Sequence, residues 1–274
     1  MSVVVPRSST LIDTAAIAAP AAKRPVRRDG IALIAVIVAV LAAMQIGSMF
    51  APAYVMPPLL VTLGAVWRVL TVEWPSILVT IGRVLVSLVL AAVTGTALGC
   101  LMGMNARLRP YLNSSLVVDT GVPALSWMLI AVFWFKNPEI RIFFVMFVIL
   151  LPFYALNVYD GIKALPKDWF EAINVFRPSR WQVLQLLIVP HIVPYVLMTT
   201  KSVIGYATRM VVFAELIGAA IGIGAKMGLA EATFHMPDVL AWTLVLVAIN
   251  IGSQAGVGAI EKKLLHWRQE ASLG

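Results

Sequence analysis

Cysteine, histidine and charged residues are scarce in this chain of 274 residues. The single cysteine, Cys100, excludes a disulfide within the chain and a metal site built from several thiolates. The three histidines lie far apart in the sequence and form no catalytic motif. Charged residues make up 12% of the chain, whereas soluble domains of ordinary composition carry about a quarter. This shortage of charge, together with 61% hydrophobic residues, indicates a membrane protein.

Motifs for ATP binding and for covalent chemistry are also missing. The sequence has no G-x-x-x-x-G-K-[ST] phosphate loop, because the run 222–226 lacks both the spacing and the hydroxyl residue that follows the lysine. No serine or threonine of the apolar runs has a paired base at a recognisable spacing. We therefore predict no catalytic residue, no metal site and no bound cofactor, and hence no enzyme activity in this chain.

Long apolar runs are abundant and predict the fold class. Each run is long enough to cross the hydrocarbon core of a bilayer, which takes about 20 residues. We expect an all-α membrane protein whose single transmembrane domain, residues 30–274, follows a disordered basic cytoplasmic tail, residues 1–29. Six transmembrane helices are expected near residues 30–50, 77–104, 115–135, 140–159, 192–220 and 237–258.

The distribution of lysine and arginine predicts how these spans are oriented. An even number of spans puts both termini on one side of the membrane. If that side is the cytoplasm, the inner segments hold fourteen Lys and Arg residues and the outer segments hold only four, which are Arg68, Lys136, Arg141 and Lys226. This asymmetry satisfies the positive-inside rule, so topology accounts for the net charge of +8, and nucleic-acid binding is not expected.

One cytoplasmic segment, residues 168–189, carries helix signals of its own. Asp168 is expected to cap a short helix, with Glu171 three residues on completing a capping box. Pro178 has to end that helix and is expected to hold Arg177 in an extended conformation. The chain is therefore expected to bend at this point.

A second helix is predicted to follow the elbow. Ser179 and Gln182 have the spacing of another capping box, and Pro190 lies where the second helix is expected to end. The first helix also carries apolar side chains that can serve as anchors for a partner, namely Phe170, Val175 and Phe176. A helix, an elbow and a second helix between two spans are typical of a docking element and not of a simple connecting loop.

The order and spacing of these motifs resemble the membrane-spanning permeases of bacterial ABC importers, and more closely the sulfonate, taurine and nitrate branch. The resemblance covers nearly the whole chain and implies the type I importer permease (MetI-like) fold. The cytoplasmic signature of that family is matched at Glu171, Ala172, Ser179, Trp181 and Pro190. Further matches are Arg83-Val84-Leu85, Gly99 to Gly103 followed by Arg107-Leu108-Arg109, Pro123 with Ser126-Trp127, and Ala214 to Gly218 with Gly222-Ile223-Gly224. Where the family carries Gly and then Ala, this chain carries Arg177 and Pro178.

The resemblance also implies partners. In such importers a separate ATPase, present in two copies, binds ATP and Mg and receives the short helix in a groove. The residues that would couple this chain to the ATPase are Glu171, Ala172, Val175, Phe176, Arg177, Pro178, Ser179 and Trp181. A solute-binding protein would lie outside the bacterial inner membrane. The second permease in the bilayer would be either a copy of this chain or a different subunit with the standard motif.

Polar residues of the spans are candidates for the pathway of a small anionic solute, such as a sulfonate, taurine, nitrate or a carboxylate. The candidates are Arg83, Asp119, Ser126, Trp127, Lys201, Arg209 and Glu215. Arg83 and Lys201 lie toward span ends, where long cationic side chains reach the interface. Arg209 lies deep in the fifth span and is expected either to bind an anion or to form an ion pair with Glu215 or Asp119.

Two other classes of protein compete with the importer. A stand-alone secondary transporter of a small organic anion would carry inverted repeats and helices interrupted at the midplane, and the sequence shows neither. An intramembrane enzyme would need metal ligands, or a nucleophile and a base, inside the spans. The importer is therefore the function that the sequence favours.

Overall fold

The structure is a computed structural model and describes residues 26–264, which are largely helical and contain no strand. The predicted all-α fold is confirmed, whereas the predicted tail, residues 1–29, lies almost wholly outside the described residues. The helices are α1 (Val26–Gly47), α2 (Leu59–Val72), α3 (Trp74–Met104), α4 (Arg109–Gly121), α5 (Ala124–Trp134), α6 (Pro138–Lys163), α7 (Lys167–Asn174), α8 (Arg180–Val183), the π-helical turn η2 (Leu184–Ile188), α9 (Val189–Gly218), α10 (Ile223–Ala232) and α11 (Met236–Leu264).

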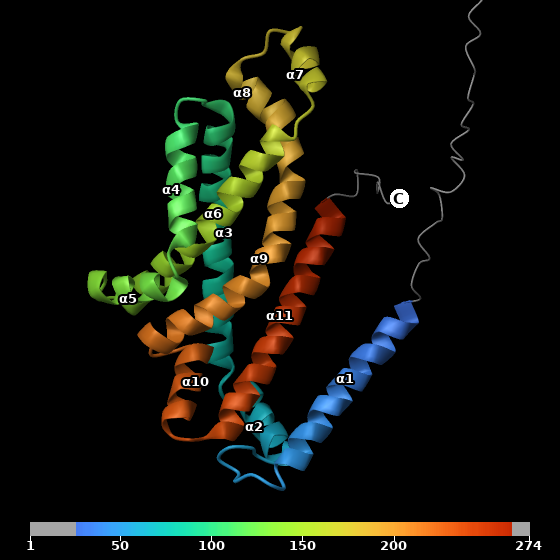
Figure 1. Ribbon diagram of the computed structural model, residues 1–274, viewed down its shortest axis with the longest axis vertical. Coiled ribbons are helices and arrows are strands. Elements are labelled where there is room, and N and C mark those ends of the chain that lie inside the picture. The colour runs from blue at the N-terminus through green and yellow to red at the C-terminus, as the bar shows by residue number, and fades with distance from the viewer. Residues whose placement is uncertain (1–25, 265–274) are drawn as a thin grey trace, which may run out of the picture.

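Helices α3, α6 and α9 pack against one another and form the centre of the bundle (Figure 1). Gly95, Gly99 and Gly103 stand about one turn apart on α3 and let its backbone approach α6 closely. A Cβ atom at Gly99 would lie 2.7 Å from the carbonyl oxygen of Ala155, and one at Gly103 would lie 2.8 Å from the side chain of Ile162. The glycine-lined face of α3 therefore meets α6 of the same chain.

The prediction of a single straight helix for the third span, near residues 115–135, is wrong. The structure has two helices there, α4 and α5, which are bent by 96° relative to each other. The bend lies at Val122 and Pro123, because proline donates no backbone hydrogen bond and disfavours the helical conformation in the residue before it. Among the described residues, four other helices are long and apolar enough to cross a membrane, and the bent pair would be a fifth span. The first expected span corresponds to α1, and the count of six stays a prediction.

Pro190 does not end the second cytoplasmic helix, contrary to the expectation from the sequence. The helix runs without interruption over Trp181–Gly218, because α8, η2 and α9 continue into one another. Pro190 lies in the first turn of α9, directly after η2. The wider π-helical turn changes the backbone pairing locally, so the helix can continue past a residue that lacks an N–H group. The predicted docking segment is therefore continuous with a membrane span.

Helices α2 and α10 and the first half of α11 form a second packed layer at the end of the bundle opposite α7 (Figure 1). Ala65 and Val69 of α2 are buried against Ile223 of α10 and against Trp242 and Val245 of α11. Helix α1 leads away from this layer and stands apart from the bundle in Figure 1. The layer covers the end of the bundle where α9 turns into α10.

We expect Gly99→Ala to destabilise the protein by about 1–3 kcal/mol, because the added Cβ would collide with the backbone of α6 and the two helices would have to separate. The matched control is Gly82→Ala on the same helix, where nothing lies within 4 Å of the added atom. Thermal unfolding in detergent should show a lower midpoint for Gly99→Ala and an unchanged or higher one for Gly82→Ala. Equal midpoints would contradict the close packing of α3 on α6.

Candidate functional site

The predicted docking element forms the α7–α8 segment, residues 167–183, at one end of the bundle between α6 and α9 (Figure 1). The predicted start of its first helix is wrong, because α7 begins at Lys167 and Pro166 occupies the capping position. Pro166 has a φ of −60°, which suits the residue before a helix, but its side chain offers no acceptor to cap the first turn. Asp168 lies in the first turn instead. Its carboxylate still stabilises α7, since the N-terminus of a helix carries partial positive charge.

A left-handed residue builds the elbow between α7 and α8, and this corrects the extended conformation expected at Arg177. Arg177 has a φ of +47°, and its N–H donates to the carbonyl of Asn174 at 3.0 Å. Glycine adopts this conformation readily, whereas it costs a residue with a Cβ about 1 kcal/mol or more. Pro178 disfavours the right-handed helical conformation at Arg177, so the chain turns through the left-handed one. Arg177 thus adopts a left-handed backbone conformation that glycine adopts more easily.

The second predicted capping box is confirmed. The N–H of Ser179 donates to Oε1 of Gln182 at 2.7 Å, and the N–H of Gln182 donates to Oγ of Ser179 at 3.3 Å. The two hydrogen bonds satisfy backbone donors that a helix start otherwise leaves without partners. They fix the start of α8 directly after the elbow, and with it the direction in which the chain leaves α7.

Helix α7 is anchored to the bundle, and large apolar residues directly after it are uncovered. Phe170 packs against the buried cluster of α6, η2 and α9, and the ring of Trp169 meets that of His191 edge-on at 6.1 Å. Val175, the C-cap of α7, and Phe176, the next residue, are 77% and 83% exposed. The other predicted coupling residues on the surface of this segment are Glu171, Ala172, Arg177, Ser179 and Trp181, with Pro178 half-buried among them. Uncovered apolar side chains next to an anchored helix are typical of surfaces that bind a partner.

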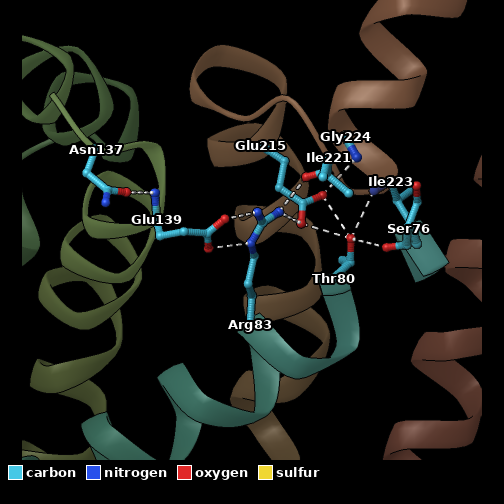
Figure 2. A network of polar contacts seen from close by, with 9 residues as sticks. All are labelled: Ser76, Thr80, Arg83, Asn137, Glu139, Glu215, Ile221, Ile223 and Gly224. Carbon is cyan, nitrogen blue, oxygen red and sulfur yellow. Dashed lines mark hydrogen bonds and ion pairs between the residues drawn. The ribbon is translucent and has the colours of Figure 1, made fainter. Parts of the chain in front are cut away.

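A buried polar network joins four helices at the opposite end of the bundle (Figure 2). Arg83 of α3, only 4% exposed, donates from Nη1 to Oε1 of Glu215 on α9 at 2.7 Å and to the carbonyl of Ile221 at 2.7 Å. Its Nε donates to Oε2 of Glu139 at the start of α6 at 2.9 Å, and its Nη2 donates to the other oxygen of that carboxylate. The guanidinium therefore bridges two carboxylates on different helices.

Glu215 is fully buried, and both of its carboxylate oxygens have partners (Figure 2). Thr80, one turn before Arg83 on α3, places Oγ1 at 2.8 and 2.9 Å from the two oxygens. The N–H of Gly224 donates to Oε2 at 2.9 Å, and the N–H of Ile223 donates to Oγ1 of Thr80 at 2.9 Å. The carboxylate thus fixes the N-terminus of α10, where backbone N–H groups attract negative charge.

Two glycines leave the room that Glu215 occupies. Gly222 has a φ of +128°, and a Cβ there would lie 2.5 Å from the carboxyl carbon of Glu215. A Cβ at Gly224 would lie 2.8 Å from the Cβ of Glu215 and 2.2 Å from the carbonyl oxygen of Val212. In the sequence this spacing is only a point of family resemblance. In the structure these two glycines allow the N-terminus of α10 to lie against the buried carboxylate of Glu215.

The structure corrects the interface position expected of Arg83 and adds Glu139 to the site. Arg83 turns inward because two carboxylates and a carbonyl there bind its N–H groups. Glu139 lies in the first turn of α6, where the side chain of Asn137 accepts a hydrogen bond from its N–H at 2.8 Å. The run Asn137-Pro138-Glu139 is a recognisable helix start, but nothing local in it indicates a partner on α3.

The remaining predicted pathway residues do not join this network. Nζ of Lys201 donates to Oε2 of Glu261 on α11 at 2.8 Å, and this pair is partly exposed. Asp119 and Trp127 line a small cavity of about 80 Å³ at the break between α4 and α5. Ser126 lies in the first turn of α5. Among the described residues, no group of three or more His, Cys, Asp or Glu could hold a metal ion.

Arg209 forms neither of the ion pairs that the sequence allows. Glu215 is bound by Arg83, and Asp119 lines the cavity beside α5. Arg209 instead donates from Nε to the carbonyl of Gly205 on its own helix at 3.0 Å. It lines an open groove of about 630 Å³ between α9 and α11, whose other polar lining residues are Thr208, Thr243 and Asn250.

The long apolar helices, four of which could each cross a membrane among the described residues, indicate a multi-pass membrane protein. The chain matches the model of the family described as binding-protein-dependent transport system inner membrane component over residues 95–266. The chain belongs to this family of transporter permeases.

Several known permeases are similar in sequence. The taurine transport system permease TauC of Escherichia coli K12 is 25% identical over 197 residues, which is 72% of this chain and 72% of the relative. The nitrate import permease NrtB of Leptolyngbya laminosa is 29% identical over 190 residues, 69% of this chain and 68% of the relative. The bicarbonate transport system permease CmpB of Synechococcus elongatus is 25% identical over 197 residues, 72% and 68% of the two chains.

A solved structure confirms the type I importer permease fold. A chain of the MetNI methionine ABC transporter in an inward-facing conformation superimposes with a TM-score of 0.63 at 15% identity. The match covers 72% of this chain and 97% of that chain. At this level of identity the likeness concerns the fold alone.

Glu215→Ala should destabilise the protein by about 3 kcal/mol, because Arg83 loses a buried partner and the N-terminus of α10 loses its carboxylate. The matched control is Glu261→Ala, which removes the partner of the half-exposed Lys201 and should change the stability by less than about 1 kcal/mol. Unfolding midpoints in detergent compare the two. If both variants unfold at the same temperature, the network does not hold the helices together.

Arg177→Gly should preserve the elbow and relieve about 1 kcal/mol of backbone strain, whereas Arg177→Val should disrupt the elbow, because a β-branched residue tolerates positive φ poorly. Hydrogen exchange of peptides that contain Gln182 reports whether the capping box after the elbow is intact. We expect wild-type protection in the glycine variant and faster exchange in the valine variant. Loss of protection in the glycine variant would show that the arginine side chain itself shapes the elbow.

Proposed function

We propose that this chain is the membrane-spanning subunit of an ATP-driven importer and that a separate ATPase docks on the α7–α8 segment. The observation that supports this most directly is the uncovered pair Val175 and Phe176, which directly follows a helix that Phe170 anchors to the bundle. A loop that only joined two spans would not need to hold large apolar side chains in water. The left-handed backbone at Arg177 also points to a shape kept for a partner.

The position of α7 gives this docking surface a mechanical connection to the far end of the bundle. A short turn joins α7 to the end of α6, and the helix after the elbow continues into α9. Helix α6 has 26 residues and is therefore about 39 Å long. Glu139 lies at the far end of α6 and Glu215 near the far end of α9, and Arg83 binds both. An ATPase that changes the angle between α6 and α9 would act on this bridge.

The bridge at Arg83 is therefore suited to hold the outer end of the pathway closed. Its two carboxylates belong to the two helices that the ATPase would move, and Glu215 also holds the start of α10. When the helices rock, the guanidinium has to exchange one partner for another or for water. Separating a buried charge from its partner costs free energy. The bridge is therefore expected to be either formed or broken, with no stable intermediate separation.

A small anionic solute is the substrate class that the relatives support. The similar permeases carry taurine, nitrate and bicarbonate in their names, and each of these molecules bears a negatively charged oxygen group. The family description names a binding protein, so a solute-binding protein on the outer side would deliver the solute. Selection among anions would lie mainly with that protein.

The complete transporter would contain two ATPase copies, which bind ATP and Mg, and a second permease. That permease would be a second copy of this chain or a related subunit. A Cβ atom added at Gly252 or Gly256 of α11 would meet nothing within 4 Å among the described residues, so this face has room to receive another helix. Both termini would lie in the cytoplasm of a bacterium, with α7 on the same side.

Co-purification tests the docking surface. Phe176→Asp and Glu171→Lys should each reduce the amount of ATPase recovered with the chain from membranes at least about tenfold, because a charge replaces an apolar anchor or reverses sign at the interface. Tyr54→Asp is the matched control, since it adds the same charge to an exposed aromatic residue in the loop between α1 and α2. ATPase recovery with this variant should equal that with the wild type.

Two results would contradict the proposal. The first is a wild-type chain that recovers no ATPase from membranes. The second is solute uptake that continues when ATP is depleted and stops when the ion gradient is collapsed, which would indicate the stand-alone secondary transporter instead.

A further inference from the structure

Arg209 is an exposed cation on α9, at the open groove beside α11, without an acidic partner among the described residues. Of the three charged residues of α9, Lys201 pairs with Glu261 and Glu215 pairs with Arg83. Within residues 26–264 no carboxylate lies within ion-pair distance of Arg209. Its Nε is held by the carbonyl of Gly205 at 3.0 Å, which leaves both Nη groups available to a ligand.

The groove beside Arg209 lies near the middle of the membrane. Asn250 lines it and is the central residue of the 29-residue helix α11, so about 21 Å of helix extends in either direction. The hydrocarbon core of a bilayer is about 30 Å thick, so lipid phosphates lie more than about 15 Å from the midplane. A guanidinium at this depth needs water or a counter-ion that can reach the groove.

Carboxylates of a second copy are poorly placed to supply that counter-ion. The acidic residues of the described spans are already engaged or lie elsewhere: Asp119 lines the cavity at the α4–α5 break, Glu139 and Glu215 bind Arg83, Glu261 binds Lys201, and Asp160 and Asp238 lie in end turns of α6 and α11. The pairs at Glu139, Glu215 and Glu261 recur in every copy of the chain, and Asp119, Asp160 and Asp238 are not among the residues that line the groove. A mobile anion is then the counter-ion that fits the site.

We propose that Arg209 and Asn250 bind the anionic group of the solute halfway along the pathway. Oδ1 of Asn250 accepts from Nε2 of Gln254 at 3.0 Å, so its amide nitrogen is left to donate. Two Nη groups and one amide match a planar or pyramidal group of three oxygens, since arginine binds such oxygens in pairs. The apolar wall of Val212 and Phe213 would receive a short carbon skeleton. This inference rests on the proposed function and adds a binding site to it.

The test measures how fast a thiol in the groove reacts with charged reagents, because the ratio of rates reports the local potential. Cys100→Ser removes the only cysteine, and Phe213→Cys then places a thiol on the groove wall one turn from Arg209. Membrane vesicles of both orientations that contain the whole transporter are treated with an anionic sulfonatoethyl or a cationic trimethylammonioethyl methanethiosulfonate. Arg209→Gln should lower the ratio of anionic to cationic rates about tenfold, since one charge acts on the two reagents in opposite senses.

Two further variants separate charge from folding. Arg209→Lys keeps the charge and should keep most of the rate ratio. Lys136→Gln removes a cation from an exposed position outside the groove and should leave the ratio unchanged. A thiol that reacts with neither reagent from either side would show that the groove faces lipid, and the anion site would be overturned. A ratio that Arg209→Gln does not alter would overturn it as well.

Uptake of labelled taurine, nitrate and bicarbonate distinguishes this inference from the proposed function. For a solute whose uptake depends on the chain, Arg209→Gln should reduce uptake at least about tenfold while the ATPase still co-purifies. Uptake that needs the chain but not Arg209 would overturn the anion site alone. A wild-type chain without an associated ATPase would overturn the proposed function, whatever the thiol rates are.

Discussion

The pairing of Glu215 with Arg83 is the contact on which the rest of the structure depends. A carboxylate without exposure in a membrane protein has to be surrounded by donors, because nothing in the lipid can replace water. Supplying these donors puts Thr80 and Arg83 on one face of α3 and the start of α10 against the end of α9. Glu139 then accepts hydrogen bonds from the remaining N–H groups of Arg83 and ties α6 to α3. One buried charge thus determines how α3, α6, α9 and α10 meet.

Features set by neighbouring residues could be predicted from the sequence, and features set by distant ones could not. Long apolar runs indicated the helices, and the reciprocal box at Ser179 and Gln182 depends on residues three apart. The partnership of Arg83 with Glu139 joins residues on α3 and α6, so a hydropathy pattern contains no sign of it. Arg177 is a third case. Pro178 allows either an extended or a left-handed backbone at Arg177, and the turn of the chain between α7 and α8 selects the left-handed one.

The two ends of the molecule have different physical characters, and α6 and α9 connect them. One end offers exposed apolar side chains on a short helix, a surface that gains stability when a protein covers it. The other end is a closed polar network, which loses stability when it is opened. Between them, the glycine-lined contact of α3 with α6 is too tight to yield, so α3 and α6 are expected to move as one body. Flexibility would then be concentrated at the π-helical turn η2 and at the proline residues near the start of α9.

The buried pair also limits how this protein can change over generations. Exchanging both Arg83 and Glu215 for apolar residues of similar size can be nearly neutral for a fold, whereas exchanging Arg83 alone leaves Glu215 as an uncompensated buried charge, and exchanging Glu215 alone leaves Arg83 with Glu139 as its one carboxylate. A lineage would have to cross that unfavourable single mutant, or lose both residues at once. The pair would therefore persist through long divergence even if other packing were equally stable, because the obstacle lies in the mutational path and not in the final state.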